Sequence, residues 1–246
     1  MSNTKLKNAP LKEVIFELFW ECSIDGAGMQ TDEGFDLAQG VFFNELKSDF
    51  PVHRKLIPDN IPLKVFGAPI HQYWTGQMQW PVVQHGQGMI AINEVEKGYE
   101  WEDTLKPIIV STVQKLVESY NRNLIFNKCR LQYINAWELT DQEPIDFVKE
   151  ILQTEISTGY HTPGNLSGFN IQSNFQLESD TQMALTITSG INNQSQKNSV
   201  IWTTLVEKNA KMQKEDILSW IDFAHNQTSS MFKKMLKPDF YVSLDQ

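Results

Sequence analysis

The strongest constraint on the fold is an order of hydrophobic patterns that occurs twice along the 246 residues. In each half, a stretch of alternating apolar residues precedes a helical stretch, then three more strand-like stretches and a second helix. The opening strands are expected at 13–21 and 129–139, and the closing helices at 103–120 and 214–236. Because the helical periods are strong and the turns between strands are short, we predict an α+β fold. Its sheet should be largely antiparallel, with the helices packed on one face.

The two halves of this pattern are residues 1–124 and 125–246, each read as strand, helix, three strands and helix. We expect them to share one continuous sheet and to form one integrated domain whose groove could hold a partner. No residue-level repeat accompanies the order, so internal duplication is a hypothesis based on element order alone.

The helical stretches themselves are well defined. In the first, Thr31 or Asp32 could cap a helix that Pro51 ends. Its apolar residues recur at helical spacing, at Phe35, Ala38, Phe42, Leu46 and Phe50. Four prolines between 51 and 69 preclude a helix there, so we expect short edge strands or loop.

Charge and hydropathy exclude several classes of partner. With 21 basic against 30 acidic residues, the chain has a net charge of −9, which argues against nucleic-acid binding. The one reservation is a lysine-rich region near the last helix, which consists of Lys208, Lys211, Lys214, Lys233, Lys234 and Lys237. No apolar run is long enough for a membrane span, and no secretory leader is recognisable. Two cysteines, Cys22 and Cys129, suit a reduced, cytoplasmic protein better than a disulfide scaffold.

Residues 79–105 contain the stretch that most resembles a ligand site. A phosphate-binding loop needs glycines that lead directly into a helix, whereas Gly88 leads into an alternating, strand-like stretch. We therefore interpret Gly86 and Gly88 as a hairpin turn or bulge. Trp80 and Trp101 are expected to pack under a sheet.

A set of short motifs, in order along nearly the whole chain, resembles a sporadically distributed prokaryotic family of uncharacterised proteins. The motifs are Pro10-Leu11-x-Glu13-Val14-x-Phe16-Glu17-Leu18, Gln79-Trp80-Pro81, Gly88-x-Ile90-x-Ile92-Asn93, Tyr99-x-Trp101, Leu131-x-Tyr133-Ile134-Asn135 and Phe223-Ala224-His225 with Phe232. The resemblance implies no activity, cofactor or catalytic residue, and the family's patchy distribution suits mobile or defence-associated genes. Family members tend to read Arg-Tyr-x-Asn-Arg where this chain has Gln132 and Ala136. An ionic role of those arginines therefore does not carry over.

Glu13 and Glu17 are the first candidates for chemistry, since they share one face of a strand. They should lie about 13 Å apart at ~3.3 Å per residue, whereas glycoside hydrolysis needs carboxylates about 5–9.5 Å apart. We interpret them as a charged strand face with Arg130 or Lys12 nearby.

No histidine pair has the spacing of a zinc site, and no nucleophile elbow, Walker or Rossmann motif occurs. His225 borders the apolar stripe of the last helix and is interpreted as a partly buried histidine. The cysteines are interpreted as inert strand residues, with a dithiol as the alternative.

We therefore expect a non-enzymatic binding or interaction protein, without cofactor or metal, whose partner is a protein or a small ligand. It could be an accessory of a defence or mobile-element operon. One alternative is a hydrolase or nucleotide-modifying enzyme that collects His85 or His225 with Glu13 or Glu17. Another is a self-associating structural subunit, a homo-oligomer formed through a sheet edge or the last helix. The candidate binding residues are Glu13, Glu17, Trp80, His85, Trp101, Tyr133, Asn135 and His225.

Overall fold

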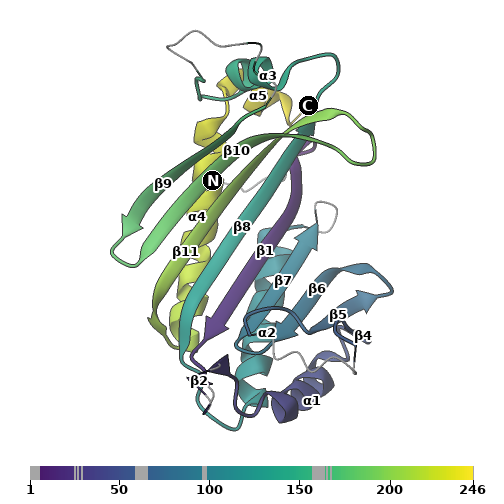
Figure 1. Cartoon of the computed structure of the whole chain (residues 1–246), viewed down its shortest axis with the longest axis vertical. Helices are drawn as coiled ribbons and strands as arrows, with labels where there is room; N and C mark the ends of the chain where they lie inside the picture. Colours follow the sequence, from purple (N-terminus) through teal and green to yellow (C-terminus); the bar gives the residue numbers. More distant parts are fainter. Residues whose placement is uncertain are drawn as a thin grey trace. The chain divides into compact units, whose positions relative to one another are not determined.

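The computed structural model of the chain describes residues 6–24, 26, 28, 30–58, 66–95, 99–156, 164, 166 and 168–245 (Figure 1). Its helices are α1 (Phe35–Leu46), the π-helical η1 (Trp101–Leu105), α2 (Lys106–Ser119), α3 (Pro144–Ile151), α4 (Lys214–Met235) and α5 (Pro238–Ser243). Its strands are β1 (Leu11–Trp20), β2 (Ser23–Ile24), β3 (Gln30–Thr31), β4 (Val52–Lys55), β5 (His71–Gly76), β6 (Gln79–Gly86), β7 (Met89–Val95), β8 (Phe126–Glu138), β9 (Asn170–Glu178), β10 (Thr181–Ile191) and β11 (Asn198–Met212).

Nine of these strands form one antiparallel sheet in the order β4-β5-β6-β7-β1-β8-β11-β10-β9, and helices pack against it. The predicted α+β class with a largely antiparallel sheet is therefore confirmed. By its internal contacts the chain divides into two compact units, described separately below. Unit 1 comprises Met1–Glu13, Gln132–Val206 and Ala224–Gln246, and unit 2 comprises Val14–Leu131 and Glu207–Phe223.

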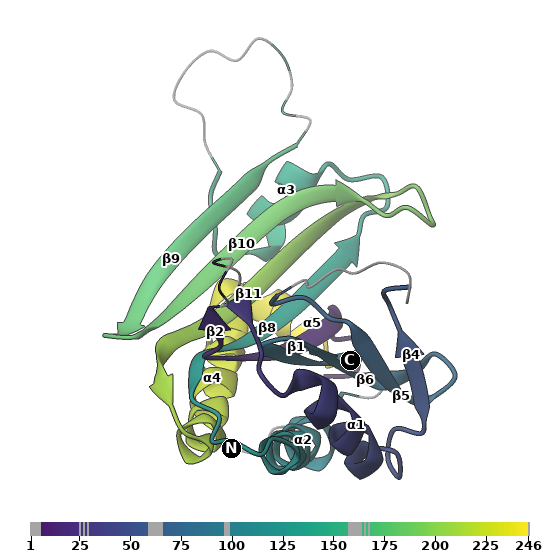
Figure 2. The ribbon, with the colours of Figure 1, turned by 60° about the horizontal axis from the view of Figure 1, so that its bottom comes forward.

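In unit 2, the helices α1 and α2 lie side by side (Figure 2). The helical spacing expected for the first helix places Phe35, Ala38, Phe42 and Leu46 in the core. On β1 the alternation expected at 13–21 buries Val14, Phe16, Leu18 and Trp20. A Leu or Phe side chain gains roughly 1.5–3 kcal/mol from such burial, so one strand face and one helix stripe stabilise each other.

In unit 1, the core lies between the strands and α3, α5 and the unit's part of α4. Trp202 and Val200 of β11 are fully buried, and Phe147 and Val148 of α3 pack in the same cluster. The segment around Leu244 closes this core, because Asn8 N donates a hydrogen bond to Leu244 O at 2.9 Å. Helix α3 ends at Ile151.

The hairpin predicted at Gly86 and Gly88 is confirmed, since Gly86 of β6 pairs with Met89 of β7. Gly88 has φ 71°, and a Cβ atom there would lie 2.4 Å from the Phe66 ring, so glycine is needed at this position. Strands β5 and β6 are joined by a turn in which Met78 has φ 57°.

Asp32 does not cap α1, contrary to the expectation from its position before the helix. The N-cap residue is Gly34, and the Asp32 carboxylate is used elsewhere. One oxygen accepts hydrogen bonds from Trp20 Nε1, Gly88 N and Tyr120 Oη, and the other pairs with Arg122 at 2.8 Å. The buried carboxylate thereby ties four separate segments of unit 2 together, which a local cap could not do.

Candidate binding site

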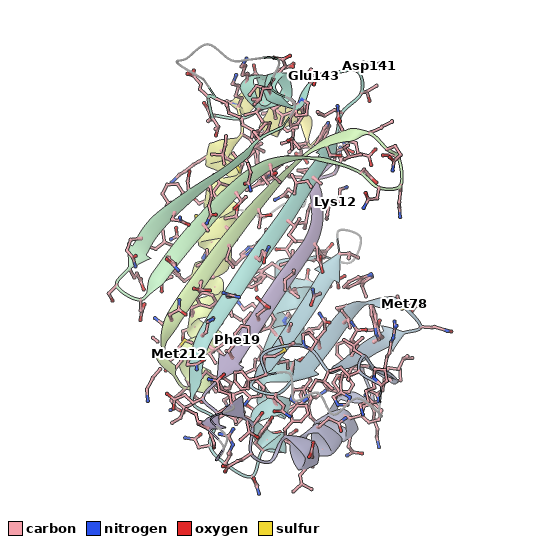
Figure 3. All side chains as sticks on the ribbon, viewed as in Figure 1. Lys12, Phe19, Met78, Asp141, Glu143 and Met212 are labelled. Atoms are coloured by element: carbon pink, nitrogen blue, oxygen red, sulfur yellow. The ribbon has the colours of Figure 1, made fainter. Side chains whose placement is uncertain are left out.

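A hollow of about 440 Å³ opens in unit 1 beside the start of β1, where Lys12 is labelled in Figure 3. It lies where the ends of β8, β10 and β11 meet the segment before β1. Its lining residues are Ala9, Pro10, Lys12, Ala136, Trp137, Glu138, Ile191, Asn192, Ser199 and Ile201. Hollows of this volume are within the range that small-molecule sites occupy.

Backbone hydrogen bonds hold the walls of the hollow. Ala136 N donates to Pro10 O at 2.9 Å, which holds the chain before β1 against β8. Leu139 N donates to Asn198 O at 2.8 Å, which joins the end of β8 to the start of β11. Because strands supply most of the wall, the site has little freedom to change shape when it is empty.

Asn192 positions a carboxylate at the rim. Its side-chain oxygen accepts the Gln194 N–H at 2.8 Å, as in an Asx turn, and this fixes the amide. The amide nitrogen then donates to Glu138 Oε1. Lys12 is exposed at the same hollow, so an acidic and a basic group both face its opening.

Ser199 lies in the wall of the hollow. It is 4% exposed, and its Oγ atom is covered and has no hydrogen-bond partner among the described residues. A buried polar group without a partner costs about 1–3 kcal/mol. Because the Oγ atom is covered, the polar groups that a ligand would meet at the opening are those of Lys12 and Glu138.

The remaining wall is apolar. Ile191 is 62% exposed at the end of β10, and Ile201 and Trp137 are half-buried. The Trp137 ring packs against the core of unit 1, stacked on Phe147 and edge-on to Phe240. The hollow therefore combines a rigid apolar surface with a few polar groups, the usual composition of a ligand site.

None of the eight candidate residues from the sequence lines this hollow. Glu17, in unit 2, lies 3.6 Å from Arg130, as the charged-face interpretation expects, and Arg130 also binds Glu207. Glu13 is half-buried in unit 1. Trp80 is 38% exposed and packs edge-on against Trp74.

Trp101 and His85 are both buried in unit 2. Trp101 Nε1 donates to Asp222 Oδ1 at 3.3 Å, which joins η1 to α4. His85 is completely buried, with its ring 4.9 Å from the Phe35 ring and 5.0 Å from the Phe42 ring. Burial lowers the pKa of His85 to about 3, so it is neutral at physiological pH.

Tyr133 and His225 are in contact in unit 1, and their positions in the sequence do not predict this contact. Tyr133 Oη and His225 Nδ1 are 2.8 Å apart, so a hydrogen bond joins β8 to α4. Asn135 is buried on the same strand. His225 is buried, as expected from its place beside the apolar stripe.

The enzymatic alternative requires His85 or His225 beside Glu13 or Glu17 in one pocket, and the hollow contains none of the four.

Three histidines that the sequence analysis did not connect lie together in unit 2, on β4, β5 and β6. His71 pairs with His85 across the strands, and His53 Nε2 is 2.9 Å from His71 Nδ1. Burial, together with the neighbouring His53 and Lys55, lowers the pKa of His71 to about 4. Within the described ranges, no group of three His, Cys, Asp or Glu residues has the arrangement of a metal site. Only the strand register could have revealed this row.

Both cysteines are free thiols in unit 2. Burial raises the pKa of Cys22 to about 12, with Asp32 adding to the effect, and burial raises the pKa of Cys129 well above its usual value. Since the thiolate is the reactive form, neither sulfur is prepared for nucleophilic attack.

The lysines near the last helix are divided between the two units. Lys211 pairs with Glu21 at 2.8 Å, and Lys214 donates to Gln114 Oε1 at 2.5 Å, both within unit 2. Lys237 donates to the Lys149 carbonyl within unit 1. These lysines are thus engaged in local contacts of their own unit.

Comparisons with protein-family models, with curated proteins and with solved structures found no match. The resemblance to the prokaryotic family therefore stays a prediction. Within the described part of the chain, no helix has both the length and the apolar composition to cross a membrane.

Proposed function

We propose that the protein is a non-enzymatic binding protein that takes a small amphipathic molecule into the hollow of unit 1. The observation that carries the proposal is a hollow of ligand size whose lining combines apolar side chains with a basic and an acidic residue, Lys12 and Glu138. The ligand would place its apolar body against Ile191 and Ile201. Lys12 and Glu138 at the opening would select its polar substituents.

The lining favours binding over covalent chemistry. It contains no histidine or cysteine, and a serine nucleophile needs an adjacent base that removes its proton. Glu138 is held at the rim by Asn192. The residues present therefore suit recognition of a ligand that leaves unchanged.

The cellular setting is proposed from the cysteines and the resemblance. Two free thiols are compatible with a cytoplasmic protein, where glutathione keeps thiols reduced. An accessory role in a defence or mobile-element operon would follow from the distribution of the resembling family.

The test begins with native mass spectrometry of the purified full chain, followed by thermal shift with a panel of small amphipathic molecules. Ala136→Leu should fill the hollow and weaken binding by tenfold or more, and Ser199→Ala should weaken it less. Ala184→Leu on β10 is the matched control, because Ala184 is also half-buried on a strand of unit 1 but does not line the hollow.

Retention of full affinity by Ala136→Leu would overturn the site. The absence of any bound mass and of any thermal shift across the panel would count against a small-molecule ligand. Conversion of the ligand by the pure protein would overturn the non-enzymatic assignment while leaving the site in place.

A further inference from the structure

We propose that two copies of the chain associate through β9, which pairs antiparallel with β9 of the second copy about a two-fold axis at Ser173. In the sheet order β9 is the terminal strand, paired with β10 on one side and with no described strand on the other (Figure 1). A terminal strand presents a row of unpaired backbone N–H and C=O groups that another chain can bind. This inference is independent of the small-molecule site.

The side chains of this edge are self-complementary. Residues 169–177 read Phe-Asn-Ile-Gln-Ser-Asn-Phe-Gln-Leu, which has the same order of apolar and amide residues in both directions from Ser173. In a two-fold antiparallel pair centred there, Ile171 faces Phe175 of the second copy, and Gln172 faces Asn174. Further out, Asn170 faces Gln176. Each of these cross-strand pairs thus joins two apolar or two amide side chains, and such pairs stabilise a sheet by roughly 0.2–1 kcal/mol each.

The backbone has the phase that this register requires. Ser189 N donates to Phe169 O at 3.1 Å, so the odd-numbered residues of this segment direct their backbone groups toward β10. The even-numbered residues, including Gln172 and Asn174, therefore direct theirs outward. In the register centred on Ser173 these outward residues lie opposite each other, and their N–H and C=O groups can be exchanged.

The strand also lacks the features that usually keep an edge from pairing. Strand β9 is nine residues long and contains no proline, and its one charged residue, Glu178, is its last. Phe175 is 41% exposed on it. A chain with an unprotected edge strand of this kind is expected to associate or aggregate.

The distribution of charge favours a second copy of the chain as the partner of β9. Each chain has a net charge of −9, so association needs a surface without acidic groups. In the proposed register the acidic residue at the end of the strand, Glu178, lies opposite Gly168 of the second copy, and no like charges meet directly. Because the pairing is closed by the two-fold axis, it stops at a dimer. A pair of single strands buries little surface, so the dimer should dissociate on dilution.

The test uses two double variants of the full chain that differ only in the sign of one charge. Gln172 and Asn174 are exposed, so their substitution leaves the core unchanged. Gln172→Lys with Asn174→Lys places Lys opposite Lys twice across the interface, and should raise the dimer dissociation constant by about tenfold or more. Gln172→Lys with Asn174→Glu places Lys opposite Glu, and should keep the dimer and make it salt-sensitive.

Analytical ultracentrifugation from low to high micromolar concentration gives the mass of each variant, and hydrogen exchange shows which amides are protected. The proposal expects a dimer for the wild-type chain, with protection of the outward amides of Gln172 and Asn174. A wild-type chain that stays monomeric throughout would overturn it. A dimer that persists equally in both double variants would place the interface on another surface and would also overturn it.

Discussion

Acidification should destabilise the folded chain through the buried histidines of unit 2, and His85 permits the effect to be calculated. Its pKa is lowered from 6.5 to about 3 in the folded state, so between these values the unfolded chain binds a proton that the folded chain does not. The contribution of neutral His85 to the free energy of unfolding is therefore fully present above pH ~6.5 and is lost as the pH falls toward 3. At about pH 5 the loss from His85 alone is about 2 kcal/mol, with a slope near 1.4 kcal/mol per pH unit.

The surroundings of the histidine row act in the same direction. The pKa of His71 is lowered to about 4 by burial, His53 and Lys55, while Asp36 opposes this shift. The pKa of His53 is lowered by partial burial and by Lys55. Protonation of the row would place positive charges side by side on neighbouring strands, so His53 and His71 add to the loss from His85.

The assay is urea unfolding, followed by tryptophan fluorescence, at a series of pH values from about 8 to 5. His85→Leu should flatten the pH dependence of the free energy of unfolding by about 1.4 kcal/mol per pH unit below pH 6. Val83→Ala is the matched control, since Val83 is buried on the same strand and does not titrate. It should lower the stability equally at every pH. Parallel curves for wild type and His85→Leu would refute the reasoning.

Three further changes have outcomes that the contacts determine. Asp32→Asn removes the charge that binds four donors and should lower the free energy of unfolding by about 3 kcal/mol, measured by chemical denaturation. Asp49→Asn, which breaks an exposed pair with Lys115, should lower it by less than about 1 kcal/mol. Gly88→Ala should cost about 2 kcal/mol because its positive φ and the adjacent ring leave no room for Cβ, while Gly26→Ala, with open space around it, should leave the melting temperature almost unchanged. Cys22, whose pKa is about 12 instead of 9, should be alkylated roughly a thousandfold more slowly at neutral pH in the folded chain than in urea; equal rates by mass spectrometry would contradict this.

The fold class followed from the sequence because burial on one face of an element leaves a periodic signal. The alternation of Val14, Phe16, Leu18 and Trp20 predicted a strand with one buried face, and these four side chains are buried. The hairpin at Gly86 and Gly88 was predictable for a similar local reason, since two glycines between alternating stretches favour a tight turn.

The roles of polar residues were not predictable in the same way, because they depend on contacts across long separations. An aspartate before a helix usually caps it, yet Asp32 instead binds Tyr120 and Arg122, which lie about ninety residues later. The His53–His71 contact depends on the register of β4 against β5, and no local pattern specifies that register.

The hollow of unit 1 was likewise not predictable from the sequence, because it depends on contacts across long separations. Ser199 alternates with buried apolar residues in a strand, a pattern that predicts an ordinary sheet residue. Its significance comes from the meeting of β8, β10 and β11 with the chain before β1, which leaves its hydroxyl without a partner among the described residues.

The edge strand is an intermediate case, because its pattern is visible in the sequence and its meaning is not. The order of apolar and amide residues from Phe169 to Leu177 is the same in both directions from Ser173, and this is readable without any structure. A central strand with this pattern would face two different neighbours, and its symmetry would have no consequence. Once the sheet order places β9 at the edge, the same symmetry makes the strand its own complementary partner. Comparison of the Lys–Lys and Lys–Glu variants therefore tests the step from pattern to partner directly.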